Sequence, residues 1–366
     1  MAKRAASDPG DPTRRCLPLN LWPAADRSAW ESLFTEGDIL DGTVGPGVLW
    51  SPVTRTNYRQ SYGRWLTFLF GQGSIAGTEA SPWERVTPDR VKAYLAELSD
   101  QDMSSWTVWG RMAGLLCTIE AMAPQQDFRW LRRIVRFHER KTINRRNKLP
   151  RLQPTHLLLD WSLRHMKAAR LDPPTKASDR SYRNAAIVGL LSCCPIRLAN
   201  LAAMSIDRHL VRTSTCYMLR FAPSETKTGH SYAAPIAEEL TQPLDHYVAE
   251  VRPRLLKGQS HDRVWVSDRG TPMAARTIHE AVTSMTKAAF GRSINAHLFR
   301  DCAATFVALE DPEHIGVVSP LLGHIDPRAA EQHYIQANQI VAGRRLRSSI
   351  DQLRKTLRPK TDRRPS

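Results

Sequence analysis

The sequence predicts a mainly α-helical protein of two domains, with one small three-stranded antiparallel sheet in the second domain. The chain has 366 residues, whereas single hydrophobic cores seldom grow past ~250 residues. Apolar residues recur at helical spacing along most of the chain, and short strand-like runs occur only between about residues 216 and 266. These observations favour a helical domain followed by a larger, mainly helical domain that contains the sheet.

The first domain is expected at residues 21–140, after a flexible N-terminal arm at residues 1–20. The arm is rich in Pro, Asp, Arg and Gly and has no apolar period. Two helix starts are marked by a capping residue before a first-turn proline, Ser51-Pro52 and Thr87-Pro88. Apolar periodicity predicts four helices, which begin near residues 51, 87, 105 and 128.

A basic segment follows, and residues 141–153 are expected to link the domains. Between Arg129 and Arg151 the sequence holds ten Lys or Arg residues against a single acid, Glu139. Such a run often forms only a solvated helix face and linker. The whole chain carries a net charge of +16 with a pI near 10.0, which favours a polyanionic partner: nucleic acid first, an anionic membrane surface second.

Several function classes lack their sequence signatures. We find no apolar run long enough to span a bilayer, and the first residues lack a signal-peptide core, so a cytoplasmic protein is expected. The six cysteines are scattered without a C-x-x-C pair, which favours reduced, mostly buried thiols over a zinc site. Walker, G-x-G-x-x-G and H-E-x-x-H motifs are not found, and no cofactor or metal is expected.

The second domain is expected at residues 154–340, before a basic tail at residues 341–366. Helices are predicted at 154–170 and 177–192, and again from Ala275 onward. Strands are predicted at 216–221, 231–236 and 263–266, and the first two are joined by a turn at residues 223–230.

Polar residues of the second domain suggest phosphodiester chemistry without a metal. A phosphodiester resists attack because its charge repels nucleophiles and its alkoxide is a poor leaving group. Arginine suits the non-bridging oxygens, since its fork of donors matches two of them at once. Arg197 lies in an almost wholly apolar stretch, where a guanidinium needs an anionic partner. His297 and Arg300 are three residues apart, so they share one helix face.

These residues and their order resemble the tyrosine recombinase (phage integrase) family. Pro195 to Leu201 resembles the helix of its first arginine, His297-Leu298-Phe299-Arg300 its H-x-x-R box, and Leu321 to His324 its L-G-H box. Glu331 to Tyr334 resembles its nucleophile box. The resemblance implies a two-domain tyrosine recombinase architecture, with a helical core-binding (SAM-like) domain before an integrase-type catalytic domain. It implies this catalytic set: Arg197, Lys227, His297, Arg300, His324 and Tyr334.

Within that set, the resemblance gives each residue a role. Tyr334 would be the nucleophile and Lys227, in the predicted turn, would protonate the departing 5′ oxygen. Lys257 or Lys287 could compete for that role. His324 would hydrogen-bond a phosphate oxygen or orient the nucleophile.

The chain departs from the family pattern at a few positions. Asn200 stands where an acidic residue is common, and an amide can hold Arg197 by hydrogen bonds but supplies no countercharge. Phe299 and Asp301 replace more usual neighbours of the second arginine, and Ala329-Ala330 replaces a commonly threonine-bearing pair. None of these changes removes a group from the implied mechanism.

The resemblance also implies partners. We expect double-stranded DNA recombination sites, a tetramer of this chain on two duplexes, and accessory directionality or DNA-bending proteins. The expected reaction integrates or excises a mobile element, or makes a related rearrangement. Phosphate contacts are expected from the basic run: Arg132, Arg133, Arg136, Arg140, Lys141, Arg145, Arg146 and Lys148.

Three alternatives remain open. A type IB topoisomerase-like enzyme would use the same constellation to nick and reseal DNA. A catalytically idle DNA-binding regulator would occupy recombination sites without cleaving them. The tail, with Leu346, Ile350, Leu353 and Leu357 at helical spacing, would dock on a neighbouring protomer or cap its own domain.

Overall fold

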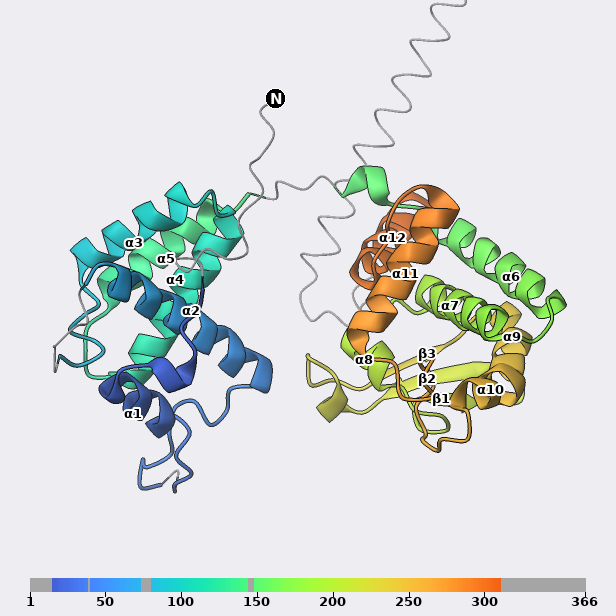
Figure 1. Cartoon of the computed structure of the whole chain (residues 1–366), viewed down its shortest axis with the longest axis horizontal. Coiled ribbons are helices and arrows are strands. Elements are labelled where there is room, and N and C mark those ends of the chain that lie inside the picture. The colour runs from blue at the N-terminus through green and yellow to red at the C-terminus, as the bar shows by residue number, and fades with distance from the viewer. Residues whose placement is uncertain (1–14, 39, 74–79, 144–147, 311–366) are drawn as a thin grey trace, which may run out of the picture. The chain divides into compact units, whose positions relative to one another are not determined.

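A computed structural model describes residues 15–38, 40–73, 80–143 and 148–310 of the chain (Figure 1). The chain divides into two compact units, residues 1–146 and 147–366. Both are mainly helical, and the second contains a three-stranded antiparallel sheet. The predicted fold class is therefore confirmed. None of the helices in the described part of the chain is long and apolar enough to cross a membrane.

Side-chain caps set the helix starts of the first unit. The hydroxyl of Ser51 accepts from the amide of Thr54 at 3.1 Å, and Thr87 caps the next long helix in the same way. Pro occupies the first turn of both helices, as the sequence predicts. The described helices of this unit are α1 (Ala24–Ser32), α2 (Pro52–Gly71), α3 (Pro88–Asp100), α4 (Ser105–Met122) and α5 (Arg129–Arg140).

The core of the first unit is aromatic and encloses one buried ion pair. Trp65 and Tyr94 are fully buried, with their ring centroids 5.2 Å apart in an edge-on arrangement. Asp26 is fully buried, pairs with the guanidinium of Arg85 and accepts a 2.7 Å hydrogen bond from the hydroxyl of Tyr62. A buried charge needs such partners, so this triad fixes α1 on α2.

Helix α7 forms the centre of the second unit. Most of its residues are buried, and it packs closely against α6 because Gly189 leaves no room for a Cβ, which would lie 2.7 Å from the hydroxyl of Ser162. The described helices here are α6 (Thr155–Leu171), α7 (Lys176–Cys193), α8 (Leu198–Ala203), α9 (Thr241–His246), α10 (Arg252–Leu256), α11 (Ala275–Phe290) and α12 (Ala296–Glu310). A π-helical segment, Tyr247–Val251, joins α9 to α10.

The sheet has the order β1-β2-β3, and both pairs are antiparallel. Its strands are β1 (Leu210–Arg212), β2 (Tyr217–Phe221) and β3 (Tyr232–Pro235). Leu219 of β2 lies opposite Leu210 on one side and Ala234 on the other. β2 and β3 match two of the predicted strands.

The third predicted strand, 263–266, is wrong as a member of this sheet. Val264, Trp265 and Val266 are buried, which explains the apolar run. Their backbone pairs with other segments through isolated bridges and not through a ladder: the amide of Val264 donates to Met204, and the carbonyl of Trp265 accepts from Met273. The place in the sheet is taken by β1, whose three residues are too few to show a strand period.

Candidate active site

One hydrogen bond joins the two predicted arginine motifs. Arg300, on α12, is 5% exposed, and its guanidinium donates to the carbonyl of Pro195 at 2.8 Å. Pro195 lies two residues before Arg197, which is the N-cap residue of α8. The start of α8 and the first turns of α12 are therefore in direct contact, although they are about a hundred residues apart in the chain.

The charges of the two arginines interact. Burial, and then the positive charge of Arg197, lower the pKa of Arg300 to about 10. Nearby Tyr232 and Asp301 act in the opposite direction. Two cations held close in a partly desolvated place are stabilised by a shared anion, and a phosphate presents oxygens to both guanidinium groups.

His297 stands in the first turn of α12, on the same helix as Arg300. Desolvation by the surrounding protein lowers its pKa below the ordinary value. Asp301 raises the pKa of His297, whereas the positive charges of Lys148, Arg300 and Arg197 lower it. His297 as a whole residue is exposed, although its ring is partly desolvated by the neighbouring side chains. A mostly neutral imidazole can donate or accept a hydrogen bond.

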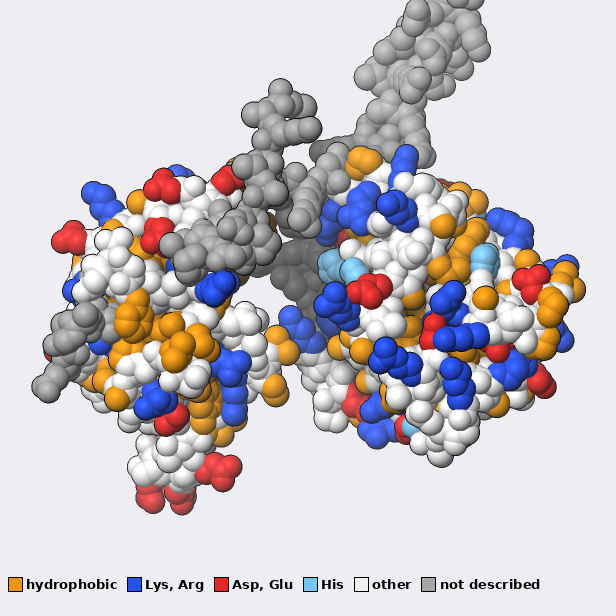
Figure 2. All heavy atoms as spheres, viewed as in Figure 1, with side chains coloured by type: hydrophobic (Ala, Val, Ile, Leu, Met, Phe, Trp, Pro, Cys, Tyr) orange, Lys and Arg blue, Asp and Glu red, His pale blue; other side chains and the backbone are white. Residues whose placement is uncertain are grey.

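Lys148 belongs to this cluster as well. Its ammonium forms a 2.9 Å ion pair with Asp301, the residue directly after Arg300. The sequence predicts Lys148 as a phosphate contact within a linker; in the structure it belongs to the second unit, and its ammonium contacts Asp301 of α12. On the visible face of that unit, Lys and Arg side chains gather beside histidine and acidic side chains (Figure 2).

Lys227 lies in the turn between β2 and β3, as predicted, and its side chain is exposed. The turn is closed by the hydroxyl of Thr226, which donates to the carbonyl of His230 at 2.8 Å, and by Gly229 with a φ of +70°. Within residues 148–310 no hydrogen bond or ion pair holds the ammonium of Lys227. The structure thus brings Arg197, His297 and Arg300 together and leaves Lys227 on an exposed turn.

The base of this turn is fastened by Asn200 and by three residues that the sequence did not single out: Glu225, His209 and Arg208. The amide of Asn200 donates to the carbonyl of Glu225 at 2.9 Å. The carboxylate of Glu225 accepts from the amide of Ala222 at 2.8 Å and contacts Nε2 of the buried His209 at 3.1 Å. It also pairs with Arg208. The hydrogen bond from Ala222 lowers the pKa of Glu225.

His209 donates in this contact. Its Nδ1 accepts a 2.9 Å hydrogen bond from the amide of Ser205, so the proton of the neutral ring is on Nε2. The only sequence signal for this arrangement is an acidic residue two positions before Lys227, which is too common to single out. The amide nitrogen of Asn200 is thus bonded to Glu225, whereas the sequence indicated only that an amide in this place can hold Arg197 by hydrogen bonds.

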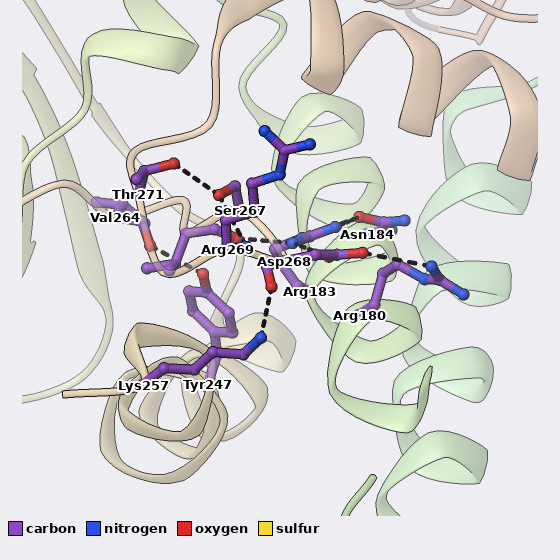
Figure 3. A network of polar contacts seen from close by, with 11 residues as sticks. Arg180, Arg183, Asn184, Tyr247, Lys257, Val264, Ser267, Asp268, Arg269 and Thr271 are labelled. Atoms are coloured by element: carbon purple, nitrogen blue, oxygen red, sulfur yellow. Dashed lines mark hydrogen bonds and ion pairs between the residues drawn. The ribbon is translucent and has the colours of Figure 1, made fainter. Parts of the chain in front are cut away.

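A second polar network fixes the segment after α10 to the central helix (Figure 3). Arg183 of α7 is 2% exposed and donates to the carbonyl of Val266 at 2.6 Å and to Asp268 at 3.1 Å. The ammonium of Lys257 donates to the carbonyl of Asp268 at 2.8 Å. The ammonium of Lys257 is therefore engaged in this network. This makes Lys257 a weaker candidate than Lys227 for the residue that protonates the departing oxygen.

The predicted phosphate contacts lie mainly on α5. Arg133, Arg136 and Arg140 are exposed on its outer face. Arg132 is also exposed but pairs with Glu120 at 2.6 Å, and the ammonium of Lys141 lies 4.2 Å from the ring centroid of Phe137. Arg145, Arg146, His324 and Tyr334 lie outside the described residues.

The cysteines and acidic residues give no sign of a metal centre in the described part of the chain. The six cysteines are free thiols there, and burial raises the pKa of Cys193 to about 11 and that of Cys194 to about 12. No group of three or more His, Cys, Asp or Glu side chains within residues 15–310, leaving out the three internal gaps, is arranged to hold an ion.

Comparison with known proteins identifies relatives. Residues 162–340 match the model of the phage integrase family. Tyrosine recombinase XerD of Halalkalibacterium halodurans is 28% identical over 160 residues, which are 43% of this chain and 51% of that protein. Tyrosine recombinase XerD of Chlorobaculum tepidum is 24% identical over 312 residues, 84% of this chain and 90% of that protein. The match thus spans about half of one relative and most of the other.

Solved structures share the fold. The pre-cleavage complex of the XerH site-specific recombinase with its difH substrate has a TM-score of 0.59 at 15% identity, and the match covers 91% of this chain and 96% of that one. The integrase of the Tn1549 transposon, in complex with transposon right end DNA, has a TM-score of 0.53 at 14% identity, and the match covers 87% of this chain and 98% of that one.

Proposed function

We propose that this chain, which matches the phage integrase family over residues 162–340 and resembles tyrosine recombinase XerD of Chlorobaculum tepidum over 84% of its length, cleaves and rejoins specific DNA sites through a covalent 3′-phosphotyrosyl intermediate. The observation that carries the proposal is the hydrogen bond from Arg300 to Pro195, which holds the second arginine against the start of α8 beside Arg197. A pair of guanidinium groups with a nearby histidine is suited to a phosphodiester, because each non-bridging oxygen meets a donor.

In the proposed reaction the hydroxyl of Tyr334 gives its proton to solvent water, and the phenolate attacks the phosphorus of the scissile group. The bond between phosphorus and the 5′ oxygen breaks as the bond to tyrosine forms. Lys227 gives a proton to the departing 5′ oxygen, and its exposed turn allows the long side chain to reach a bound strand. Arg197 and Arg300 stabilise the charge that develops on the non-bridging oxygens, and His297 and His324 hydrogen-bond the same group.

The covalent bond conserves the energy of the phosphodiester that was broken. A 5′ hydroxyl from a partner duplex can therefore attack the phosphotyrosine and release Tyr334 without a nucleotide cofactor. The first unit is the proposed core-binding domain, and the exposed arginines of α5 are its proposed phosphate contacts. We further propose a tetramer on two duplexes, helped by accessory directionality or bending proteins, that acts in the cytoplasm on a mobile element or a related rearrangement.

The nucleophile is tested with a suicide substrate, a nicked duplex whose short 5′ fragment leaves after cleavage. Since the site sequence is unknown, the substrate comes from DNA that the full-length protein selects from a random pool. The wild type is expected to form a covalent adduct, and Tyr334→Phe to bind the same DNA without one. Tyr217→Phe, which removes a hydroxyl on β2 that contacts Asp245, serves as the control and keeps the adduct. An adduct in Tyr334→Phe places the nucleophile elsewhere, and loss of the adduct in EDTA contradicts the scheme.

A catalytically idle DNA-binding protein is the second candidate, and Asn200 favours it. The amide of this residue is engaged with Glu225 and brings no negative charge to Arg197. This candidate predicts DNA binding by the wild type with no adduct on the suicide substrate. Relaxation of supercoiled DNA by a monomer, without a preferred site, would instead favour a type IB topoisomerase-like enzyme.

A further inference from the structure

The segment that leads into the second unit is attached to the helix of His297 and Arg300. Arg151 donates to the carbonyl of Ser293 at 3.0 Å, just before α12. The amide of Gln153 lies 3.5 Å from the sulfur of Cys302, and Arg292 donates to the carbonyl of Pro150. With the ion pair from Lys148 to Asp301, these contacts hold residues 148–153 along the first turns of α12.

Asp301 is the unusual residue in this arrangement. It is one of the departures from the family pattern, its side chain is only 12% exposed, and it directly follows Arg300. A carboxylate in this place attracts the guanidinium groups that a phosphate needs. If the ammonium of Lys148 is removed, a largely buried negative charge loses compensation, and the nearest cations are drawn to it.

We propose that Lys148 is a positioning residue for the active site: it neutralises the Asp301 carboxylate, so that Arg300 and His297 remain directed at the scissile phosphate. The inference rests on the proposed function for its consequence in catalysis. It also makes the end of the basic run part of the site, because Lys148 is one of the last residues of that run.

The alternative role for Lys148 is a direct contact with a DNA phosphate. Its side chain is 47% exposed, so a phosphate could reach it. The two roles differ in their dependence on Asp301. A positioning lysine is needed only while the carboxylate is present, whereas a phosphate contact acts whether or not Asp301 is charged. A double-mutant cycle separates them.

The cycle uses full-length Lys148→Met, Asp301→Asn and the double variant, with single-turnover adduct formation on the suicide substrate. We expect Lys148→Met to slow adduct formation about tenfold, which corresponds to about 1.4 kcal/mol, with DNA affinity little changed. The double variant is expected to regain most of the rate. Lys148→Arg keeps the charge and should remain close to wild type. Lys167→Met, which removes an exposed lysine of α6, is the matched control and should also keep the wild-type rate.

Two outcomes overturn the proposal. In one, Lys148→Met retains the wild-type rate. In the other, its defect persists at full size in the Asp301→Asn background and comes with weaker DNA binding and a smaller salt dependence, as expected for a phosphate contact.

If the wild type forms no adduct, the proposed function fails. A second measurement still tests the role of Lys148 in that case. The titration of His297 is followed by NMR in the DNA-free protein, and its signal is assigned by its loss in His297→Gln. Loss of the positive charge of Lys148 should raise the pKa of His297, and loss of the negative charge of Asp301 should lower it. An unchanged pKa in both variants, with the fold intact by circular dichroism, means that the pair does not act on the site.

Discussion

The side-chain amide of Asn200 donates to the backbone carbonyl of Glu225 at 2.9 Å. This bond ties α8, which begins directly after Arg197, to the turn that carries Lys227. Glu225 is held in turn by His209 and by its own hydrogen bond to Ala222. Hydrogen bonds therefore fix the base of this turn, while the side chain of Lys227 is exposed at its tip.

Replacement of Asn200 tests whether this base matters for catalysis. Asn200→Ala removes the donor, and Asn200→Asp replaces it with a carboxylate that repels the carbonyl of Glu225. Both variants should form the adduct about 2- to 12-fold more slowly, since the lost hydrogen bond contributes about 0.5–1.5 kcal/mol net. Amide hydrogen exchange of residues 223–230 should become faster in both. A faster adduct in Asn200→Asp would show instead that a countercharge near Arg197 matters more than the turn.

Replacement of Arg300 by lysine should impair DNA cleavage. An ammonium cannot donate to the carbonyl of Pro195 and to a phosphate with the same planar fork. Arg300→Lys is expected to lower the single-turnover rate by about 10²–10³-fold, as for loss of one donor to a developing anion. Arg276→Lys, at an exposed arginine of α11 paired with Glu280, provides the control and should keep full activity. Near-normal cleavage by Arg300→Lys would remove this residue from the clamp.

The arginines of α5 should set the salt dependence of DNA binding. The triple variant Arg133→Gln, Arg136→Gln and Arg140→Gln removes the charges that would neutralise up to three phosphates. The slope of log affinity against log salt should fall by about 0.9 for each phosphate that is no longer neutralised. Arg129→Gln, on the same helix but paired with Asp127 at 2.7 Å, should change the slope less. Equal slopes for the wild type and the triple variant would show that this face of α5 does not meet the DNA.

The buried triad of the first unit should dominate its stability. Asp26→Ala leaves the buried guanidinium of Arg85 without its carboxylate, which should destabilise the unit by about 3–5 kcal/mol. Tyr62→Phe removes only the hydroxyl and should cost about 1–2 kcal/mol. Urea unfolding followed by tryptophan fluorescence reports this unit, because most of the chain's 10 tryptophans lie in it. Similar losses in the two variants would argue against an ion pair at this place.

Acid should destabilise the second unit partly through His297. Its pKa in the folded chain is lowered, mainly by desolvation, so at a pH between the folded and unfolded values the unfolded chain binds more protons. The contribution of His297 is complete above the ordinary histidine pKa of ~6.5 and is lost as the pH falls through the lowered value. His297→Gln should therefore reduce the slope of unfolding free energy against pH in this window. His230→Gln, at an exposed turn histidine, is the control, and equal slopes in the two variants contradict the assignment.

Local signals predicted much of the fold. Ser51-Pro52 and Thr87-Pro88 mark the starts of α2 and α3 because a cap and a first-turn proline act within a few residues. The sheet was harder to predict. β1 has three residues, and the buried run at Val264 has the composition of a strand, so a one-dimensional pattern assigned the third strand to the wrong segment.

The site was predictable as a set of residue types and less so as a set of contacts. Arg197, His297 and Arg300 were singled out by the resemblance of their segments to family motifs, and their charges interact in the structure. The partners of Asn200 and Lys148 could not be inferred, since Glu225 and Asp301 lie 25 and 153 positions away in the chain. Such pairings follow from tertiary packing, which leaves no local period in the sequence.

The bond from Arg300 to Pro195 has a consequence for protein engineering. A chimera of two recombinases could be made to change the DNA sequence that is targeted. A crossover between residues 195 and 300 takes the two ends of this bond from different parents, and the guanidinium then meets a backbone that evolved with another helix. A crossover at the boundary between the units takes both ends of the bond from one parent. Such a chimera should keep the cleavage activity of that parent while the other unit changes the DNA sequence that is bound.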